Sequence, residues 1–181
     1  MNTPDSIERV LLDEEKIAAR VRELAAQISA DYADSDGLVL VGVLKGAFIF
    51  MADLARRLQV AHHVDFIALS SYSKSTVSNG AVRLIMDTRA SVAGRNVLVV
   101  EDILDTGHTL DYLLRTFRAR NPASLRTCVL ISKPEQRQVE VKVDYLGFEI
   151  LNEWVVGYGL DYADRFRTLP YIGVLKREVY E

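Results

Sequence analysis

Apolar and polar residues first follow a helical pattern, between residues 13 and 34 of the chain. The apolar positions there are Ile17, Val21, Leu24 and Ile28, three or four residues apart. This spacing predicts an amphipathic helix with one face turned toward a core. Asp13 is its expected N-cap, because a carboxylate can accept a hydrogen bond from a free backbone N–H of the first turn.

The pattern then changes to short apolar runs that alternate with helical segments. Continuous apolar runs are typical of strands covered on both faces, and strands are predicted at residues 38–44, 64–72, 81–87, 96–102 and 125–133. Helices are predicted at 46–58 and 108–120, and the last third reads as short strands and turns. This order predicts an α/β fold with a mainly parallel, doubly wound sheet. No repeat or linker interrupts it, so residues 1–181 are expected to form one domain.

Polar residues follow three of the predicted strands. They occur in VLKG (43–46), VEDILDTGHT (100–109) and ISKP (131–134). In open α/β sheets, ligands bind outside the carboxyl ends of the strands. We therefore expect the three segments to meet in one site.

The composition narrows the class of protein. Hydrophobic residues make up 49% and charged residues 26%, which is usual for a soluble globular domain. The net charge of −3 argues against a broad basic surface for nucleic acid. There is no apolar run of about 18 residues and no leader pattern, so a cytoplasmic protein without membrane contact is expected. The one cysteine, Cys128, lies in an apolar run and is predicted to be a buried, inert thiol.

The segment DTGHT, residues 105–109, stands where a helix is predicted to begin. The first backbone N–H groups of a helix lack intrahelical partners, and the helix dipole favours an anion there. Gly107 permits close approach of the backbone, while Thr106 and Thr109 add hydroxyl donors. The segment is therefore a candidate phosphate site, with an ordinary capped helix start as the alternative. The chain lacks the G-x-x-x-x-G-K-[ST] motif of nucleoside triphosphate binding.

Three carboxylates precede or begin this segment: Glu101, Asp102 and Asp105. Acids beside an apolar strand repel one another and cost free energy unless a partner offsets their charge. Sugar hydroxyls, or water molecules around Mg²⁺, would serve as partners. Asp105 is also placed to take or share a proton. The alternative is a set of solvated acids at a strand end.

These motifs together resemble a known family. VLVVEDILDTGHTL (97–110) is similar to the phosphoribosyl diphosphate (PRPP) motif of type I phosphoribosyltransferases, and in particular of the hypoxanthine-guanine phosphoribosyltransferases. VGVLKGAFIFMADL (41–54) resembles the family's pyrophosphate loop and SSYSKST (70–76) its mobile loop. SKP (132–134) and residues 153–175 resemble its purine-binding hood. The resemblance implies a mainly parallel twisted sheet flanked by helices, with a small hood of C-terminal and N-terminal residues over the strand ends, formed mainly by about residues 143–181.

The resemblance also implies roles for single residues around PRPP. Asp105 would be the acid beside purine N7, and Glu101 and Asp102 would serve the ribose hydroxyls and Mg²⁺. Residues 105–109, namely Asp105, Thr106, Gly107, His108 and Thr109, would hold the 5′-phosphate. The pyrophosphate group would be bound by Lys45, Gly46 and Arg167. Ser71 and Tyr72 would belong to the loop that closes over the reacting bond.

Four further residues are implied around the base. Lys133 would donate to the purine 6-oxo group, Trp154 would stack on the ring, and Val155 would pair with the base through its backbone. Asp161 would hold a second Mg²⁺.

The implied reaction joins hypoxanthine or guanine to PRPP and gives IMP or GMP plus pyrophosphate, with Mg²⁺ as cofactor and a homodimer or homotetramer as the assembly. One alternative is a transferase for xanthine or another base. A second is an RNA-binding attenuator of pyrimidine operons, which shares the fold. The negative net charge argues against RNA, as does the presence of Asp105 and Lys133, which an attenuator need not keep.

Overall fold

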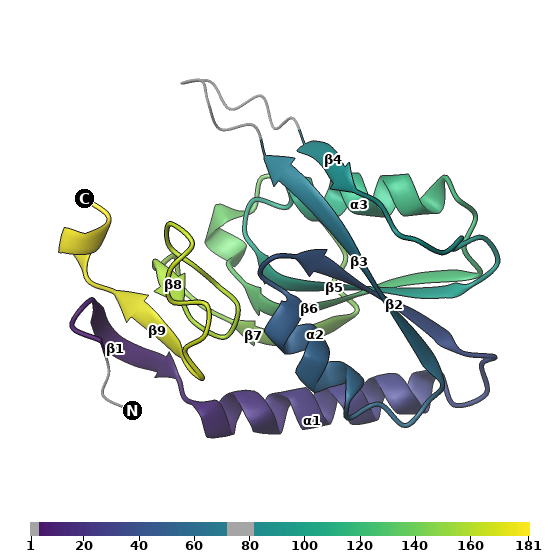
Figure 1. Ribbon diagram of the computed structural model, residues 1–181, viewed down its shortest axis with the longest axis horizontal. Helices are drawn as coiled ribbons and strands as arrows, with labels where there is room; N and C mark the ends of the chain where they lie inside the picture. Colours follow the sequence, from purple (N-terminus) through teal and green to yellow (C-terminus); the bar gives the residue numbers. More distant parts are fainter. Residues whose placement is uncertain (1–3, 72–81) are drawn as a thin grey trace.

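The structure is a computed structural model and describes residues 4–71 and 82–181. Its larger sheet has six strands: β2 (Leu38–Leu44), β3 (His62–Ser71), β4 (Val82–Met86), β5 (Asn96–Leu104), β6 (Ser124–Ser132) and β7 (Tyr145–Glu149). Their order is β4-β3-β2-β5-β6-β7 (Figure 1). All neighbours are parallel except β4, which runs antiparallel to β3. The predicted mainly parallel α/β sheet is confirmed.

Helices cover both faces of this sheet. Helices α1 (Glu14–Asp31) and α2 (Phe48–Ala55) pack on one face, and α3 (His108–Arg118) packs on the other (Figure 1). The side chains of β2 show why both faces of the sheet must be covered by helices. Leu38 and Leu40 join the cluster with α1 and α2, whereas Val39 and Val41 join the cluster with α3. Because alternate residues of a strand point to opposite faces, a continuous apolar run requires cover on both sides.

The predicted elements agree with the observed ones except at their ends. Asp13 caps α1, accepting a hydrogen bond of 2.8 Å from the Lys16 N–H. Helix α2 is shorter than predicted at both ends: residues 45–47 form a turn before it, and it ends at Ala55 rather than at residue 58. Strand β5 continues two residues beyond Asp102, to Leu104. No helix in the described part of the chain is both long and apolar enough to span a membrane.

A second, smaller sheet stands beside the first and forms the hood. Its strands are β1 (Ile7–Leu12), β9 (Ile172–Leu175) and β8 (Val155–Val156), in the order β1-β9-β8, with antiparallel pairs (Figure 1). Strand β1 was not predicted, because its partner strand β9 lies at the other end of the sequence and local patterns do not indicate the pairing. Strand β7 lies inside the range expected for the hood but pairs with β6 in the larger sheet.

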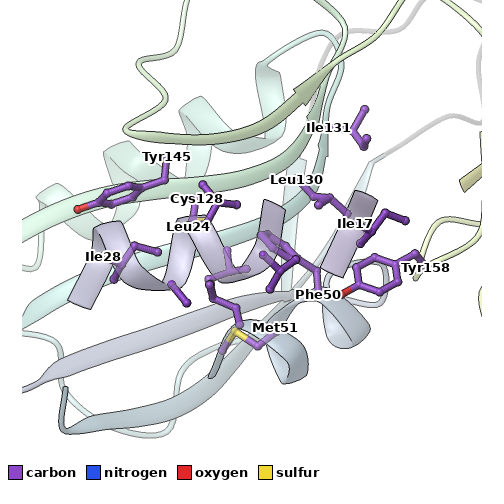
Figure 2. Close-up of a cluster of buried hydrophobic side chains, with 14 of the residues drawn as sticks. Ile17, Leu24, Ile28, Phe50, Met51, Cys128, Leu130, Ile131, Tyr145 and Tyr158 are labelled. Atoms are coloured by element: carbon purple, nitrogen blue, oxygen red, sulfur yellow. The ribbon is translucent and has the colours of Figure 1, made fainter. Parts of the chain in front are cut away.

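The hood is fixed to the larger sheet through its inner side. Tyr158 extends into the main apolar cluster beside Ile17 and Phe50 (Figure 2). Its hydroxyl donates a hydrogen bond of 2.6 Å to Asp53 of α2. Cys128 lies in the same cluster, where burial raises the pKa of its thiol far above the usual value. The predicted burial of this cysteine is confirmed.

Candidate functional site

The turn after β2, the acids of β5 and a loop of the hood lie in direct contact. A Cβ atom added to Gly46 would overlap the Asp102 carboxylate, and one added to Gly159 would overlap the carbonyl oxygen of Gly46. Gly159 also has a φ of +107°, in the left-handed region that side chains disfavour. The Leu44–Lys45 peptide bond in this turn is cis. Two glycines thus let three distant segments meet at the carboxyl ends of the strands.

The DTGHT segment leads into α3 and lines a cavity. Gly107, at φ +95°, is the N-cap residue, and the first intrahelical bond runs from the Asp111 N–H to the Gly107 oxygen over 3.0 Å. The N–H groups before Asp111 are therefore not used within the helix. A cavity of about 190 Å³ is lined by Glu101, Asp105, Thr106, Gly107 and Thr109, together with three apolar residues. Four of the five predicted phosphate residues thus surround one small space, whereas His108 does not line it.

Residues 137–139, which the sequence did not single out, pack against the DTGHT segment and support it. The N–H groups of Gln138 and Val139 both donate to the Thr106 oxygen, over 2.9 and 3.0 Å. A Cβ atom on Gly107 would overlap the Val139 oxygen, so the two backbones are packed closely. His108 directs its Nε2 to the Gln138 Oε1 at 3.1 Å. These contacts fix the loop geometry, and no local motif in residues 137–139 signals them.

Glu101 and Asp102 are buried, each only 8% exposed. They are therefore not solvated acids at a strand end. Burial raises the Glu101 pKa well above its usual value, and the neighbouring Asp102 charge adds to this rise. Burial also raises the Asp102 pKa, against hydrogen bonds and the charge of Arg167, which lower it. Glu101 Oε2 has no hydrogen-bond partner among the described residues. Such a pair is suited to a cation or to hydroxyl donors.

We expect Glu101→Gln to stabilise the ligand-free protein at neutral and higher pH. The folded-state pKa of Glu101 lies above the ordinary 4.5, so its contribution is greatest below that pH and is lost as pH rises through the folded value. An unpaired buried polar group costs about 1–3 kcal/mol. For a chain of this size that corresponds to a Tm increase of roughly 2–10 °C at pH 8, shrinking toward pH 5.

Thermal unfolding at several pH values measures this difference. Glu149→Gln, at an exposed position of β7, is the matched control and should leave Tm unchanged. A Glu101→Gln protein that melts at or below the wild-type temperature at pH 8 would contradict the expectation.

Two positively charged side chains that were predicted to bind pyrophosphate both contact one carboxylate, that of Asp164. Lys45 Nζ lies 2.8 Å from Asp164 Oδ1, and Arg167 Nη2 lies 3.0 Å from the same oxygen. Arg167 also contacts Asp161 Oδ1 at 2.7 Å and donates to the Gly159 oxygen over 2.8 Å. Sequence reasoning missed Asp164, because nothing local distinguishes it from other surface acids.

Lys133 joins the end of β6 to the end of β5, directly before the DTGHT segment. Its backbone N–H donates to the Leu104 oxygen over 3.0 Å, and its side chain is buried. Burial lowers the pKa of its ammonium, while the charges of Asp105 and Glu153 oppose this shift. The lysine is therefore close enough to Asp105, which lines the cavity, for the two charges to interact.

Trp154 and Val155 belong to the hood at strand β8. Val155 is buried, whereas Trp154 is 53% exposed. Strand β8 is an edge strand, so part of its backbone is free to bind another molecule. Of the expected closing loop, Ser71 is the last residue of β3, and Tyr72 lies outside the described residues.

Comparisons with known proteins agree on one family. Residues 9–163 match the model of the phosphoribosyl transferase domain. The hypoxanthine-guanine phosphoribosyltransferase of Bacillus subtilis (strain 168) is 50% identical over 175 residues, covering 97% of each chain. A hypoxanthine phosphoribosyltransferase structure from Staphylococcus aureus is 43% identical with a TM-score of 0.93, covering 98% of this chain and 96% of that one. The Trypanosoma cruzi enzyme in complex with the product IMP is 44% identical with a TM-score of 0.93, covering 99% and 100%.

Proposed function

Because this chain belongs to the phosphoribosyltransferase family, we propose that it transfers the 5-phosphoribosyl group of PRPP to N9 of hypoxanthine or guanine. The products are IMP or GMP and pyrophosphate, so the reaction salvages purines. The observation that carries this function is the cavity between the start of α3 and the buried Glu101, with Lys133 at the neighbouring strand end. An assay with PRPP, Mg²⁺ and each of four purine bases tests it. Turnover of none of the oxopurines would overturn it.

The ribose 5′-phosphate would occupy the cavity at residues 105–109. Backbone N–H groups at the start of α3 and the hydroxyls of Thr106 and Thr109 supply donors, and the helix dipole favours the negative charge. His108 contacts Gln138 rather than only solvent, so its ring helps to hold the loop. The segment 137–139 keeps the loop in shape before substrate arrives.

The pyrophosphate group would bind at the turn after β2. Lys45 and Arg167 supply the positive charge, and Gly46 lets the backbone approach closely. Both cations stabilise the negative charge that builds on the leaving group as its bond to the sugar lengthens. In the ligand-free protein, Asp164 takes the place that a phosphoryl oxygen would fill.

We expect Asp164→Asn to tighten binding of PRPP and pyrophosphate, because a neutral amide no longer competes for Lys45 and Arg167. Ion pairs between exposed groups are weak, so KM for PRPP should fall by only roughly 2–5-fold. Initial rates against PRPP, and inhibition by pyrophosphate, measure the effect. Asp36→Asn, an exposed acid before β2, makes the same charge change as a control. A raised KM for PRPP in Asp164→Asn would show that the carboxylate assists binding instead.

Mg²⁺ would be held by Glu101 and Asp102, with Asp161 at a second position. The unpaired Oε2 of Glu101 and the raised pKa values of both buried acids suit a divalent cation with its water shell. Asp161 fits less freely, since its two oxygens already accept from Arg167 and from the Asp164 N–H. When bound, the ion would neutralise charge on the diphosphate of PRPP.

The base would lie between β6 and the hood. The Lys133 ammonium donates to the 6-oxo group, the exposed edge of β8 pairs with the base through Val155, and Trp154 supplies a stacking surface. Asp105, near Lys133, takes or shares the N7 proton as the bond to N9 forms. The acids of β5 favour the positive charge that develops on the sugar. Residues 71–80, largely outside the described residues, are proposed to close over this site.

The assembly and location are also proposals. Val64, Ile85 and Met86 are exposed apolar residues of β3 and β4, which supports association of two or four copies. The single buried cysteine fits a reducing compartment such as the cytoplasm.

A further inference from the structure

The last residues of the chain fold back over the hood. After β9, the Lys176 N–H donates to the Ser6 oxygen over 3.0 Å. The short 3₁₀ helix η2 (Arg177–Val179) then turns the chain, with the Tyr180 N–H bonded to the Arg177 oxygen over 3.1 Å. This turn lies on the side of the hood away from the larger sheet (Figure 1). The penultimate residue is therefore placed by defined backbone contacts.

Tyr180 stacks on the indole of Trp154. The two ring centroids are 5.3 Å apart and the ring planes differ by 29°. Tyr162 meets the same indole edge-on, at 6.0 Å and 86°. Both distances fall in the range of favourable aromatic pairs. Two rings from separate segments thus restrict the orientation of one half-exposed tryptophan.

The Trp154 backbone and the preceding Glu153 side chain make contacts that do not involve these rings. The Leu175 N–H donates to the Trp154 oxygen over 2.8 Å, and Glu153 is paired with Arg9 at 2.6 Å. The side chain, however, is 53% exposed and has two rotatable bonds. The stacking of Tyr180 and the edge contact of Tyr162 therefore limit its orientation in the ligand-free protein.

The two faces of the hood explain how the indole can serve a ligand. Tyr180 and Tyr162 pack with Ile7 and Val156 on one side, whereas Val155 joins the core cluster on the other. Tyr180 therefore covers the indole from the outer cluster and leaves about half of the Trp154 surface open. A flat ligand can use that open surface without displacing Tyr180.

We propose that Tyr180 is a positioning residue for purine binding, which holds the Trp154 indole in the orientation that the base requires. The proposal rests on the proposed function, since Trp154 is assigned there to the base. A surface that is already oriented loses less rotational freedom on binding. An aromatic pair of this kind affects binding by roughly 2–10-fold. The effect should fall on the base and not on PRPP.

The first measurement needs no substrate. Trp154 is the one tryptophan of the chain, so fluorescence excited at wavelengths that tyrosine does not absorb reports on it alone. In the full-length protein, Tyr180→Ala should increase quenching by acrylamide and lower the fluorescence anisotropy. Tyr180→Phe keeps the ring and should match wild type. Glu178→Ala, an exposed change in the same turn, is the matched control. Unfolding temperatures establish that each variant is folded.

The second measurement is kinetic. Tyr180→Ala should raise KM for hypoxanthine by roughly 2–10-fold, while KM for PRPP and kcat stay within twofold of wild type. Tyr180→Phe should restore the wild-type KM. An unchanged KM for hypoxanthine, or an equal rise in both KM values, would overturn the proposal, as would unchanged quenching. A wild-type protein inactive on all oxopurines would refute the proposed function itself, and quenching would still decide whether Tyr180 holds Trp154.

Discussion

Asp105→Asn is expected to lower kcat by about 10²–10⁴-fold, the usual value of general acid–base assistance. Asp105 lies at the wall of the phosphate cavity, exposed and close enough to Lys133 for its charge to act on the ammonium. Asparagine keeps the shape and much of the hydrogen bonding of aspartate. It removes the negative charge and the ability to accept the N7 proton. KM for PRPP should remain nearly unchanged, because the phosphate donors are untouched.

Steady-state rates with hypoxanthine, and a PRPP binding measurement, test this expectation. Asp111→Asn is a suitable control, because it removes a carboxylate in the first turn of α3, where Asp111 is paired with Arg115. It should change kcat by less than threefold. An Asp105→Asn enzyme within threefold of wild type would remove Asp105 from the proton transfer.

The second large effect is the exclusion of adenine by Lys133. Its ammonium has three donors and no acceptor, so it can meet the 6-oxo group of hypoxanthine or guanine. Opposite the 6-amino group of adenine, donors would face donors. Lys133 is only 8% exposed, so water cannot relieve the mismatch. Sites that leave buried polar groups unpaired can discriminate by about 10⁴-fold or more. The wild-type enzyme should thus use hypoxanthine and guanine and be nearly inert with adenine.

Lys133→Gln should reduce the ratio of kcat/KM for hypoxanthine to kcat/KM for adenine, because an amide can turn either its oxygen or its nitrogen toward the base. The ratio should fall mainly because kcat/KM for the oxopurines is lower. Lys142→Gln removes an exposed lysine of the loop before β7 and should leave the ratio of hypoxanthine to adenine kcat/KM unchanged. Adenine turnover comparable to hypoxanthine in the wild type would refute the role of Lys133 and the oxopurine specificity with it.

The sequence by itself determined the helices and strands of the larger sheet, though not strand β1 of the hood, and the order of the site motifs. The helical spacing of Ile17 to Ile28, the apolar runs of β2 and β5 and the start of α3 at DTGHT all follow from residues within a few positions of one another. Such features can be predicted because the helical repeat of 3.6 residues and a continuous apolar run involve only residues close together in the sequence. The convergence of three strand ends also followed, since parallel strands end on one edge.

The tertiary structure alone decided which distant residues share a contact. The hood takes a strand from residues 7–12, Asp164 joins Lys45 across 119 positions, and Tyr180 covers Trp154. The burial of Asp102 was not predictable from the sequence either, because Asp102 lies against the turn at Gly46, which in turn lies against Gly159 of the hood. Local patterns determine the secondary structure of each segment, but they do not specify which distant segment packs against it. That choice is made only when the whole chain packs, because a contact between distant residues depends on the path of all the chain between them.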